Sequence, residues 1–480
     1  MRFYFRKYLH SLLIFLAVES VWPCTIAVVS GTHYGRPILW KNRDVPNVHQ
    51  EVRYFDGEPF DFVGNVYEGE TNRTWAGINS AGFGIVNTDT YNQGPRGTTG
   101  PDDGEVMYYA LENFATIDEF QAYLDSTNAS GRRGTHCYGV IDAFGGAAIF
   151  EAARFDYVRF DAYDNPENVL IRTNYADSGD PDSLVGEERR IRAEEIISIS
   201  TSIDPELFLF VLARDLATEE LDPYPLPFTG IFGSYPPGVI STHHTINRYY
   251  TSSSSVIVGQ GKDLIPGVLW EYLGQPIVSI PVPVWVRAGA VPPGLCSPSG
   301  SELCDLANEF KSLIYVMPWA IDTYILSDLL AFFHTCERDI YHEVEWYYTA
   351  GPSEFPDSSE LATIEYNMVN QVLAKYYEIR ALLVHERGYD IPSQARIVVR
   401  PNPFNGRGSL EVFSPKAGCA DVVLYDMSGR IAAFLMRSAS IFPGQNSVSI
   451  TTENLPSGIY TACLSINNQK QAASRVVVVK

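Results

Sequence analysis

The pattern of hydrophobic and polar positions changes character twice along the chain. From residue 24 to about residue 290, short apolar runs bounded by Gly, Asn and Asp predict mostly strands. Helical insertions in this region are predicted at residues 105–114, 117–124, 187–199 and 205–216. Residues 301–386 repeat their apolar positions at a helical period, and beyond residue 392 short alternating strands are separated by regular turn sequences.

These three regions predict two folded units. Residues 24–390 are expected to form an α+β domain whose mainly helical part, residues 301–386, covers its sheets as outer helices, because the apolar residues there need a partner surface. An independent helical appendage is the alternative for that part. Residues 396–480 are expected to form a separate, small Ig-like β-sandwich.

The first 23 residues have a composition of their own. Arg2, Arg6 and Lys7 give a positively charged start, and residues 12–18 are continuously apolar. This is the pattern of a secretory signal peptide, which is too short to span a membrane as a mature helix, and a single-pass anchor is the alternative. Residues 1–23 are therefore predicted to be a leader, and the protein is expected to be secreted or displayed at the cell surface.

The charge of the chain excludes one large class of partner. The 480 residues include 35 Lys and Arg against 57 Asp and Glu, which gives a formal net charge of -22. Nucleic-acid binding depends on neutralising phosphates with Lys and Arg, so nucleic acid is not an expected partner. Hydrophobic residues make up 45% of the chain, which is enough for a large buried core.

The chain contains an odd number of cysteines. The seven are Cys24, Cys137, Cys296, Cys304, Cys336, Cys419 and Cys463. An exported protein can form disulfides, and Cys296 with Cys304 or Cys419 with Cys463 are plausible pairs. An odd count leaves at least one thiol unpaired within the chain, and Cys24 is the candidate.

Cys24 directly follows the predicted leader, and three interpretations are open for it: a lipid-anchored, a structural or a nucleophilic cysteine. Trp22-Pro23 stands where lipid processing requires small residues, which argues against the anchor. As a new N-terminal residue, Cys24 could pass its thiol proton to its own α-amino group, since the amine titrates at about 7.7–8.0 and the thiol at about 8.5. The thiolate would attack an amide carbonyl, and water would hydrolyse the resulting thioester. If signal peptidase cuts after Ser20, Cys24 itself could remove the three residues before it.

The sequence around Cys24 resembles a known family. Cys24-Thr25, followed by Trp40-Lys41-Asn42-Arg43-Asp44, is similar to the N-terminal nucleophile (Ntn) cysteine hydrolases of the choloylglycine hydrolase, penicillin acylase and isopenicillin N acyltransferase group. Further similar motifs follow in the same order at residues 77–85, 139–142, 147–151, 172–174, 188–193 and 248–255. The resemblance implies a four-layer αββα sandwich. It also implies that Asp44 holds the nucleophile, that Asn174 donates to the oxyanion, and that Arg248 is a late catalytic arginine.

Two positions of this resemblance stay open. One branch of the family has an Arg three residues before the Asp, where this chain has Lys41, while Arg43 stands one residue before the Asp. Lys and Arg are not equivalent hydrogen-bond donors, so either residue could take the role. The second oxyanion donor could be Asn87, or Asp89 could stand in its place.

Histidines were the remaining candidates for dyad or metal chemistry. His136, His243 and His244 could suggest a Cys–His dyad or a ligand set. The adjacent pair His243-His244 would point to opposite sides of a strand, which is a poor arrangement for two ligands. The Cys and His residues do not have the spacing of a zinc site, so no metal and no cofactor are expected.

Residues 396–480 resemble the C-terminal sorting domain of bacterial type IX secretion substrates. The motifs that carry this resemblance lie at residues 401–405, 424–430, 455–460 and 475–480. It implies recognition by an outer-membrane secretion machinery, and a generic adhesive or spacer sandwich is the alternative.

The sequence thus predicts a secreted hydrolase of linear, non-peptide amide C–N bonds. It would act on a small-molecule N-acyl amide through the Cys24 thiolate and a thioester acyl-enzyme. An acyltransferase that passes the same acyl group to an amine acceptor is the nearest alternative. The other alternative is an inactive, surface-displayed binding protein of the same fold, which Lys41 in place of Arg would suit. The sequence determines neither the particular amide nor the oligomeric state.

Overall fold

The computed structural model describes the chain from Pro23 onward, with short gaps. The described residues are 23–261, 265–349, 354–387, 394–403, 407–415, 418–441, 444–451, 455–467 and 469–479. Residues 1–22 of the predicted leader, which spans residues 1–23, lie outside the described residues.

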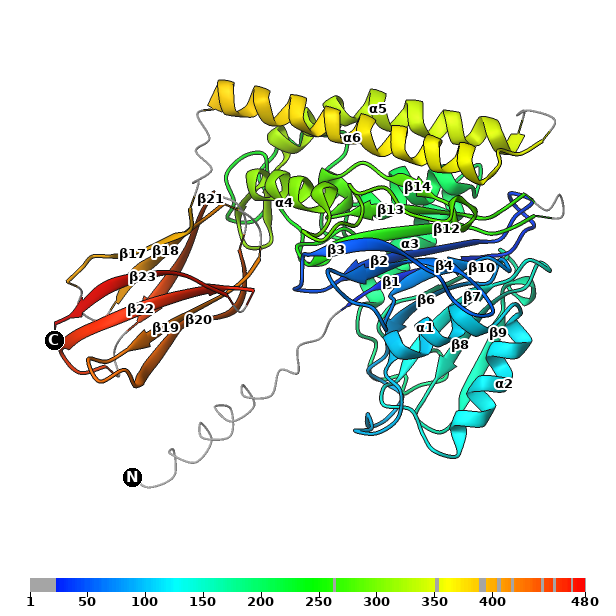
Figure 1. Cartoon of the computed structure of the whole chain (residues 1–480), viewed down its shortest axis with the longest axis horizontal. Coiled ribbons are helices and arrows are strands. Elements are labelled where there is room, and N and C mark those ends of the chain that lie inside the picture. Colours follow the sequence, from blue (N-terminus) through cyan, green and yellow to red (C-terminus); the bar gives the residue numbers. More distant parts are fainter. Residues whose placement is uncertain are drawn as a thin grey trace.

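Two antiparallel sheets lie face to face at the centre of the larger domain (Figure 1). The six-stranded sheet has the order β10 (Val169–Arg172), β1 (Thr25–Val29), β2 (Ile38–Asp44), β12 (Thr251–Val258), β13 (Val268–Leu273), β14 (Val282–Val284). The seven-stranded sheet has the order β3 (Gln50–Phe55), β4 (Phe62–Tyr67), β5 (Ala76–Asn79), β6 (Gly84–Asp89), β7 (His136–Ile141), β8 (Ala147–Ala152), β9 (Tyr157–Asp161).

The first strand shows why the sheets stack. All five residues of β1 are buried, because the strand is covered on both faces and is a continuous apolar run rather than an alternating one. β1 contacts β6, β7 and β8 of the opposite sheet, and β2 contacts β6 and β7. The space between the sheets is filled by side chains such as Val28, Leu39 and Val86, each of which is fully buried.

Helices form the two outer layers. α1 (Asp103–Asn113) packs on β5 and β6, and α2 (Ile117–Asn128) packs on β8, so both cover the seven-stranded sheet. Each begins with a capping box, Asp102 with Glu105 and Thr116 with Glu119, which satisfies free N–H groups of the first turn. α3 (Glu187–Ile199) packs against β10 on the other sheet. The predicted four-layer αββα order is confirmed.

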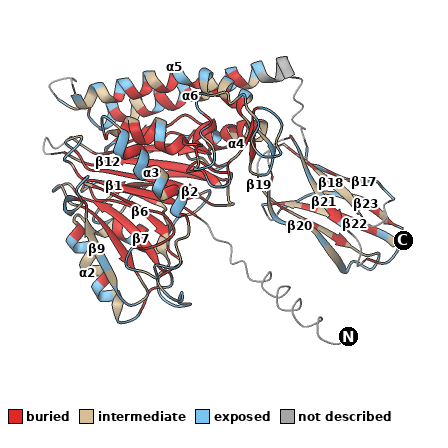
Figure 2. Cartoon of the chain, turned by 180° about the vertical axis from the view of Figure 1, so that it is seen from behind, coloured by how far each residue is buried: buried red, intermediate tan, exposed pale blue. Residues whose placement is uncertain are grey.

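The predicted helical part lies over the six-stranded sheet. α4 (Glu302–Ile314) contacts β13, α6 (Ser358–Arg387) contacts β14, and α5 (Thr323–Thr349) runs beside α6 along one side of the domain (Figures 1 and 2). Between α4 and α5, the hairpin of β15 (Tyr315–Met317) and β16 (Ala320–Asp322) pairs with β11 (Val239–Ser241). None of the helices in the described residues has the length and apolar character needed to cross a membrane.

The helix predicted at residues 205–216 is helical but not a regular α-helix. It consists of a π-helical turn, Leu207–Val211, followed by a 3-10 turn, Leu212–Arg214. Leu207, Leu209 and Leu212 are all buried, so this apolar run follows the packing of the core rather than a regular helical period.

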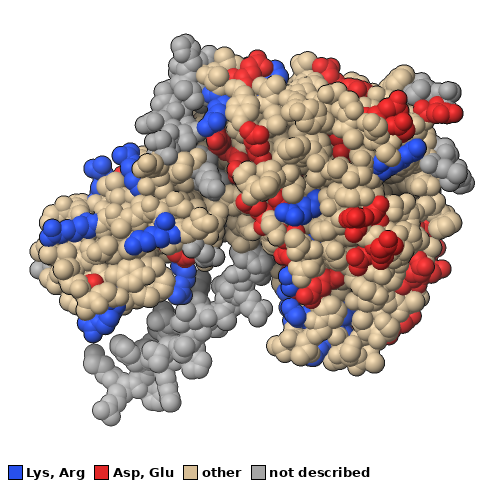
Figure 3. Space-filling view, viewed as in Figure 1, with Lys and Arg blue, Asp and Glu red and all other residues tan. Residues whose placement is uncertain are grey.

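The C-terminal part is a β-sandwich with a hydrophobic core of its own, as predicted. One sheet contains β17 (Arg396–Arg400), β18 (Arg407–Ser414) and β21 (Gly444–Thr451). The other contains β20 (Ile431–Ile441), β19 (Gly418–Tyr425), β22 (Gly458–Ile466) and β23 (Gln469–Val478). Basic side chains stand out on this part, whereas acidic side chains gather on the larger domain in the same view (Figure 3).

The two suggested disulfides are not formed, and all seven cysteines are free. In the register of β19 and β22, Cys463 lies opposite Val423, four residues from Cys419. Four residues of strand span about 13 Å, which is too far for a disulfide. Cys304 donates its thiol to the carbonyl oxygen of Val48 at 3.1 Å rather than facing Cys296.

Candidate active site

Cys24 lies immediately before β1 and lines a cavity of about 410 Å³. Its exposed fraction is 7%, so the sulfur is enclosed rather than free at the surface. Lys41 and Arg43 of β2 and Asn87 and Asp89 of β6 line the same cavity. The predicted nucleophile and both pairs of residues that the sequence left open are therefore brought together.

Lys41 is a buried cation beside the thiol. Its Nζ donates to the carbonyl oxygen of Trp75 at 2.8 Å and to Oδ1 of Asn87 at 2.5 Å. Burial lowers the pKa of Lys41 to about 8, and the neighbouring Cys24 partly opposes this. Burial likewise raises the pKa of Cys24, while the positive charge of Lys41 lowers it. Each group thus favours the charged form of the other.

Arg43 faces the same cavity but has a different environment. Its guanidinium lies 4.2 Å from the ring centroid of Tyr67 and 4.5 Å from that of Trp75, and it donates to Oε1 of Gln50. The contacts with Tyr67 and Trp75 are cation–π interactions that order the aromatic wall of the cavity. Of the two positions that the sequence left open, Lys41 contacts Asn87, and Arg43 packs against the aromatic wall of the cavity.

Asp44 and Arg248 meet behind the cavity, where neither is a lining residue. Thr251 donates to Oδ1 of Asp44 at 2.6 Å, and Nε of Arg248 lies 4.0 Å from Oδ2. Burial raises the pKa of Asp44 to about 6, although Arg248 and Arg189 lower it. A backbone hydrogen bond from Asp44 to Cys24 lowers the pKa of the thiol. Asp44 thus lies next to Cys24.

Asn174 is connected to Cys24 through an arginine that the sequence did not single out. Nη1 of Arg189 donates to the carbonyl oxygen of Cys24 and to Oγ1 of Thr25, each at 2.7 Å, and Nη2 donates to Oδ1 of Asn174 at 2.7 Å. Nδ2 of Asn174 donates to the carbonyl oxygen of Asp89 at 3.0 Å. Asn174 therefore supports the site from outside the cavity lining.

A signal for Arg189 was present in the sequence. On α3, Arg189 precedes Ala193, Ile196 and Ile197 by four, seven and eight residues, which is the spacing of one helix face, and all four are buried. Arg190 and Arg192 on the same helix are only partly exposed and form ion pairs with Asp177 and Asp215.

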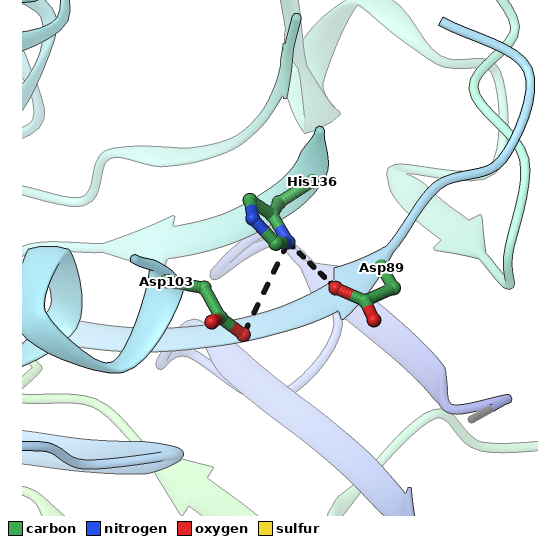
Figure 4. A group of neighbouring side chains, drawn as sticks. All are labelled: Asp89, Asp103 and His136. Carbon is green, nitrogen blue, oxygen red and sulfur yellow. Dashed lines mark ion pairs between the residues drawn. The ribbon is translucent and has the colours of Figure 1, made fainter. Parts of the chain in front are cut away.

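Asp89, Asp103 and His136 form a charged cluster in the cavity wall (Figure 4). Nδ1 of His136 lies 2.8 Å from Oδ1 of Asp89 and 4.0 Å from Oδ2 of Asp103. Asp89 and His136 are directly opposite in the register of β6 and β7, and α1 brings Asp103 to them. Burial alone would lower the pKa of His136, but the two carboxylates raise it above its ordinary value.

This cluster is the one group among the described residues whose ligand atoms could together hold a metal ion, with all three atoms within 4.8 Å of one another. Its carboxylates already have cationic or polar partners. Oδ2 of Asp89 lies 3.1 Å from Arg96, and Oδ2 of Asp103 accepts from Asn87 at 2.7 Å. A divalent cation would add charge beside Arg96, so the surroundings favour a protonated His136 over a metal.

Comparison with known proteins identifies the C-terminal part. Residues 398–480 match the family described as the secretion system C-terminal sorting domain. These residues are therefore a sorting domain, and the chain carries a signal for export by a secretion system. A comparison with curated protein sequences gives no significant match.

Three solved structures that are similar to part of this chain are remote in sequence. A conjugated bile acid hydrolase variant from Clostridium perfringens is 13% identical, over 52% of this chain and 89% of that chain, with a TM-score of 0.33. Penicillin V acylase from Agrobacterium tumefaciens is 19% identical, over 55% and 85%, with a TM-score of 0.33. A Caenorhabditis elegans ortholog of N-acylethanolamine-hydrolyzing acid amidase is 14% identical, over 50% and 95%, with a TM-score of 0.35. At these TM-scores the similarity carries no argument, and the domain is described by its own αββα layers.

Proposed function

We propose that this protein is an exported hydrolase of linear, non-peptide amide C–N bonds whose nucleophile is Cys24, placed at the N-terminus by cleavage. The observation that carries the proposal is the environment of Cys24. The residue lies at a cavity of about 410 Å³, beside the Lys41 cation, and its carbonyl oxygen is held by Arg189. A structural cysteine in a core would need none of these charged neighbours.

Asp44 is proposed to hold the α-amino group that cleavage releases. Its Oδ2 is buried and has no hydrogen-bond partner among the described residues, with Nε of Arg248 4.0 Å away. An α-ammonium at Cys24 would supply the missing donor, since the Asp44 backbone already hydrogen-bonds the thiol. This unpartnered carboxylate oxygen supports the requirement for a free N-terminus.

The proposed reaction has two halves. The α-amine takes the thiol proton, sulfur bonds to the carbonyl carbon, and the C–N bond breaks as the ammonium protonates the leaving nitrogen. Water then adds to the thioester, releasing a carboxylic acid and restoring the thiol. The proposed oxyanion donors are Lys41 and Asn87, which line the cavity, and Asn174, whose Nδ2 would exchange the Asp89 carbonyl for the substrate oxygen.

The sorting domain supports the proposal that this reaction occurs outside the cytoplasm. Residues 398–480 imply contact with a secretion machinery, which we propose to be the type IX system of an outer membrane. Residues 1–23 are proposed to be the leader for the preceding step across the inner membrane. The proposed substrate is a small-molecule N-acyl amide, in keeping with the N-acylethanolamine that the name of one similar structure describes.

The experiment that tests the function combines N-terminal mass mapping with a panel of N-acyl amides. Wild type should begin at Cys24 and hydrolyse at least one amide. Cys24→Ala should remain folded, with a cooperative melting transition, and lose hydrolysis by at least about a thousandfold. Added amine acceptors distinguish an acyltransferase, which would form a new amide in preference to the acid. Hydrolysis by Cys24→Ala at the wild-type rate would overturn the proposal.

A further inference from the structure

A continuous hydrogen-bonded path connects the cation beside the nucleophile to the charged cluster in the cavity wall. Nζ of Lys41 donates to Oδ1 of Asn87 at 2.5 Å, and Nδ2 of Asn87 donates to Oδ2 of Asp103 at 2.7 Å. Asp103 in turn lies 4.0 Å from Nδ1 of His136. The path crosses from β2 in one sheet, through β6 in the other, to the start of α1 in the outer layer.

Electrostatics fixes the orientation of the Asn87 amide. Its carbonyl oxygen faces an ammonium and its NH2 group faces a carboxylate. The opposite orientation would place NH2 against the Lys41 ammonium and an oxygen against the Asp103 carboxylate, which are two repulsive contacts in a buried site. Asp103, by accepting from the other end of Asn87, therefore holds the amide oxygen of Asn87 against Lys41.

Asp103 is well suited to be the fixed end of this path. It is the first residue of α1, whose N-cap Asp102 forms a capping box with Glu105, so its backbone is held by the helix start. Its carboxylate also faces His136, whose side chain is only 5% exposed and which pairs with Asp89. The charged groups around His136 are Asp89, Arg96 and Asp103.

A lysine at position 41 has a particular need for such support. Its ammonium is a point charge on a flexible four-carbon stem, whereas an arginine's planar fork is preorganised for paired hydrogen bonds. The Trp75 carbonyl is one anchor for Nζ, and Asn87 is the other. Without the second anchor, the ammonium is free to leave the thiol.

We infer that Asp103, held by the start of α1 and by His136, is a positioning residue that keeps Lys41 beside Cys24 through Asn87. The inference rests on the proposed function in one respect, which is that the charge of Lys41 serves the reaction of Cys24. It assigns Asp103 and His136 a role in setting the reactivity of the thiol and none in contacting the substrate.

The test measures the thiol directly and needs no substrate. The rate of Cys24 alkylation by iodoacetamide is followed against pH by peptide mapping in wild type, Asp103→Ala and Asp103→Asn. Alanine removes the acceptor for Asn87, so Lys41 loses its anchor and the alkylation midpoint should move up by about one pH unit. Asparagine keeps an acceptor oxygen and loses only the charge, so its midpoint should stay close to wild type. Both variants lose the same favourable contact with the helix N-terminus.

Asp118→Ala is the matched control for that loss. Asp118 lies in the first turn of α2 with 87% of its side chain exposed, and it takes no part in the path. It should leave the alkylation profile unchanged. An unchanged midpoint in Asp103→Ala, with melting temperature lowered as in Asp118→Ala, would overturn the inference and leave Asp103 a helix-start residue.

Two further measurements distinguish this inference from a metal site and from the proposed function. Adding Zn²⁺ or Mn²⁺ to chelator-treated wild type should not change its melting temperature, and a rise that Asp103→Ala abolishes would show a metal site instead.

On an amide substrate, Asp103→Ala should lower kcat about tenfold with KM nearly unchanged. If wild type hydrolyses no amide while the alkylation shift is seen, the proposed function fails and the positioning stands. If hydrolysis is normal in Asp103→Ala, the positioning fails and the function stands.

Discussion

The guanidinium of Arg189 donates a hydrogen bond to the carbonyl oxygen of Cys24 at 2.7 Å, so a helix of the outer layer fixes the backbone beside the proposed nucleophile. The same guanidinium also bonds Asn174, and burial lowers its pKa to about 10. An arginine is buried here because three acceptors surround it, and each of them would otherwise be a buried group without a donor.

Replacing Arg189 with lysine is expected to damage both stability and catalysis. A single ammonium cannot reach the acceptors on Cys24, Thr25 and Asn174 together, so at least one stays unpaired, at a cost of about 1–3 kcal/mol in the free energy of unfolding. We expect kcat to fall at least tenfold, because the backbone at Cys24 is less well placed. Urea unfolding and steady-state kinetics check this. Arg190→Lys on the same helix is the control, and equal losses in both variants would contradict the special position of Arg189.

Substitutions of Lys41 and Arg43 are expected to change different kinetic constants. Lys41→Met removes the charge beside the thiol, so kcat should fall by about a hundredfold while KM changes little. Arg43→Met removes the cation–π contacts with Tyr67 and Trp75, worth about 0.5–2 kcal/mol, so KM should rise several-fold while kcat is largely kept. Michaelis–Menten curves of both variants on one substrate decide the matter. A reversed pattern would show that Arg43, and not Lys41, is the cation that serves the reaction.

The buried carboxyl of Asp44 is expected to make stability depend on pH. In protein that keeps the residue before Cys24, burial raises the pKa of Asp44 from 3.8 to about 6. Between these values the folded chain keeps a proton that the unfolded chain has released, so this group lowers the free energy of unfolding as pH rises through that window. Asp44→Asn removes the ionisable group, so this contribution to the pH dependence of the free energy of unfolding is lost. Its stability relative to wild type should therefore be higher at pH 7 than at pH 4.

Urea unfolding at both pH values measures this difference, with Cys24→Ala as the background so that cleavage does not interfere. The difference in relative stability between pH 4 and pH 7 should be smaller in mature protein, because an α-ammonium beside Asp44 favours the carboxylate. A relative stability that is the same at pH 4 and pH 7 would show that Asp44 is not buried as a charged group.

Deleting residues 396–480 is expected to block export without inactivating the enzyme. The larger domain and the β-sandwich have separate hydrophobic cores, so the truncated chain should fold. It should accumulate between the two membranes with its amidase activity intact. Cell fractionation, with activity assayed in each fraction, measures this. Normal release of the truncated protein would leave the sorting domain without a role in export.

Much of the larger domain was predictable because its signals are local. The strands at β1 and β2, the helices α1 and α2, and the position of Asp44 twenty residues after Cys24 all follow from short sequence patterns. The π-helical turn at Leu207–Val211 did not follow, since a continuous apolar run does not show which turn the core will accept.

The features that escaped prediction depend on contacts between distant elements. The cluster of Asp89, Asp103 and His136 needs the register of two strands and the entry point of a helix, neither of which the spacing of the residues contains. The suggested bridge of Cys419 with Cys463 failed for the same reason, because strand register sets which residues meet. The position of Arg189 on the buried face of α3 was visible, but its partners were not.

The most direct measurement is peptide mapping of enzyme quenched during turnover of an N-acyl amide. We predict an acyl group in thioester linkage on a peptide that begins at Cys24 and carries a free amine. Fully active protein whose chain begins before residue 24, or an acyl group found on a different residue, would contradict the account.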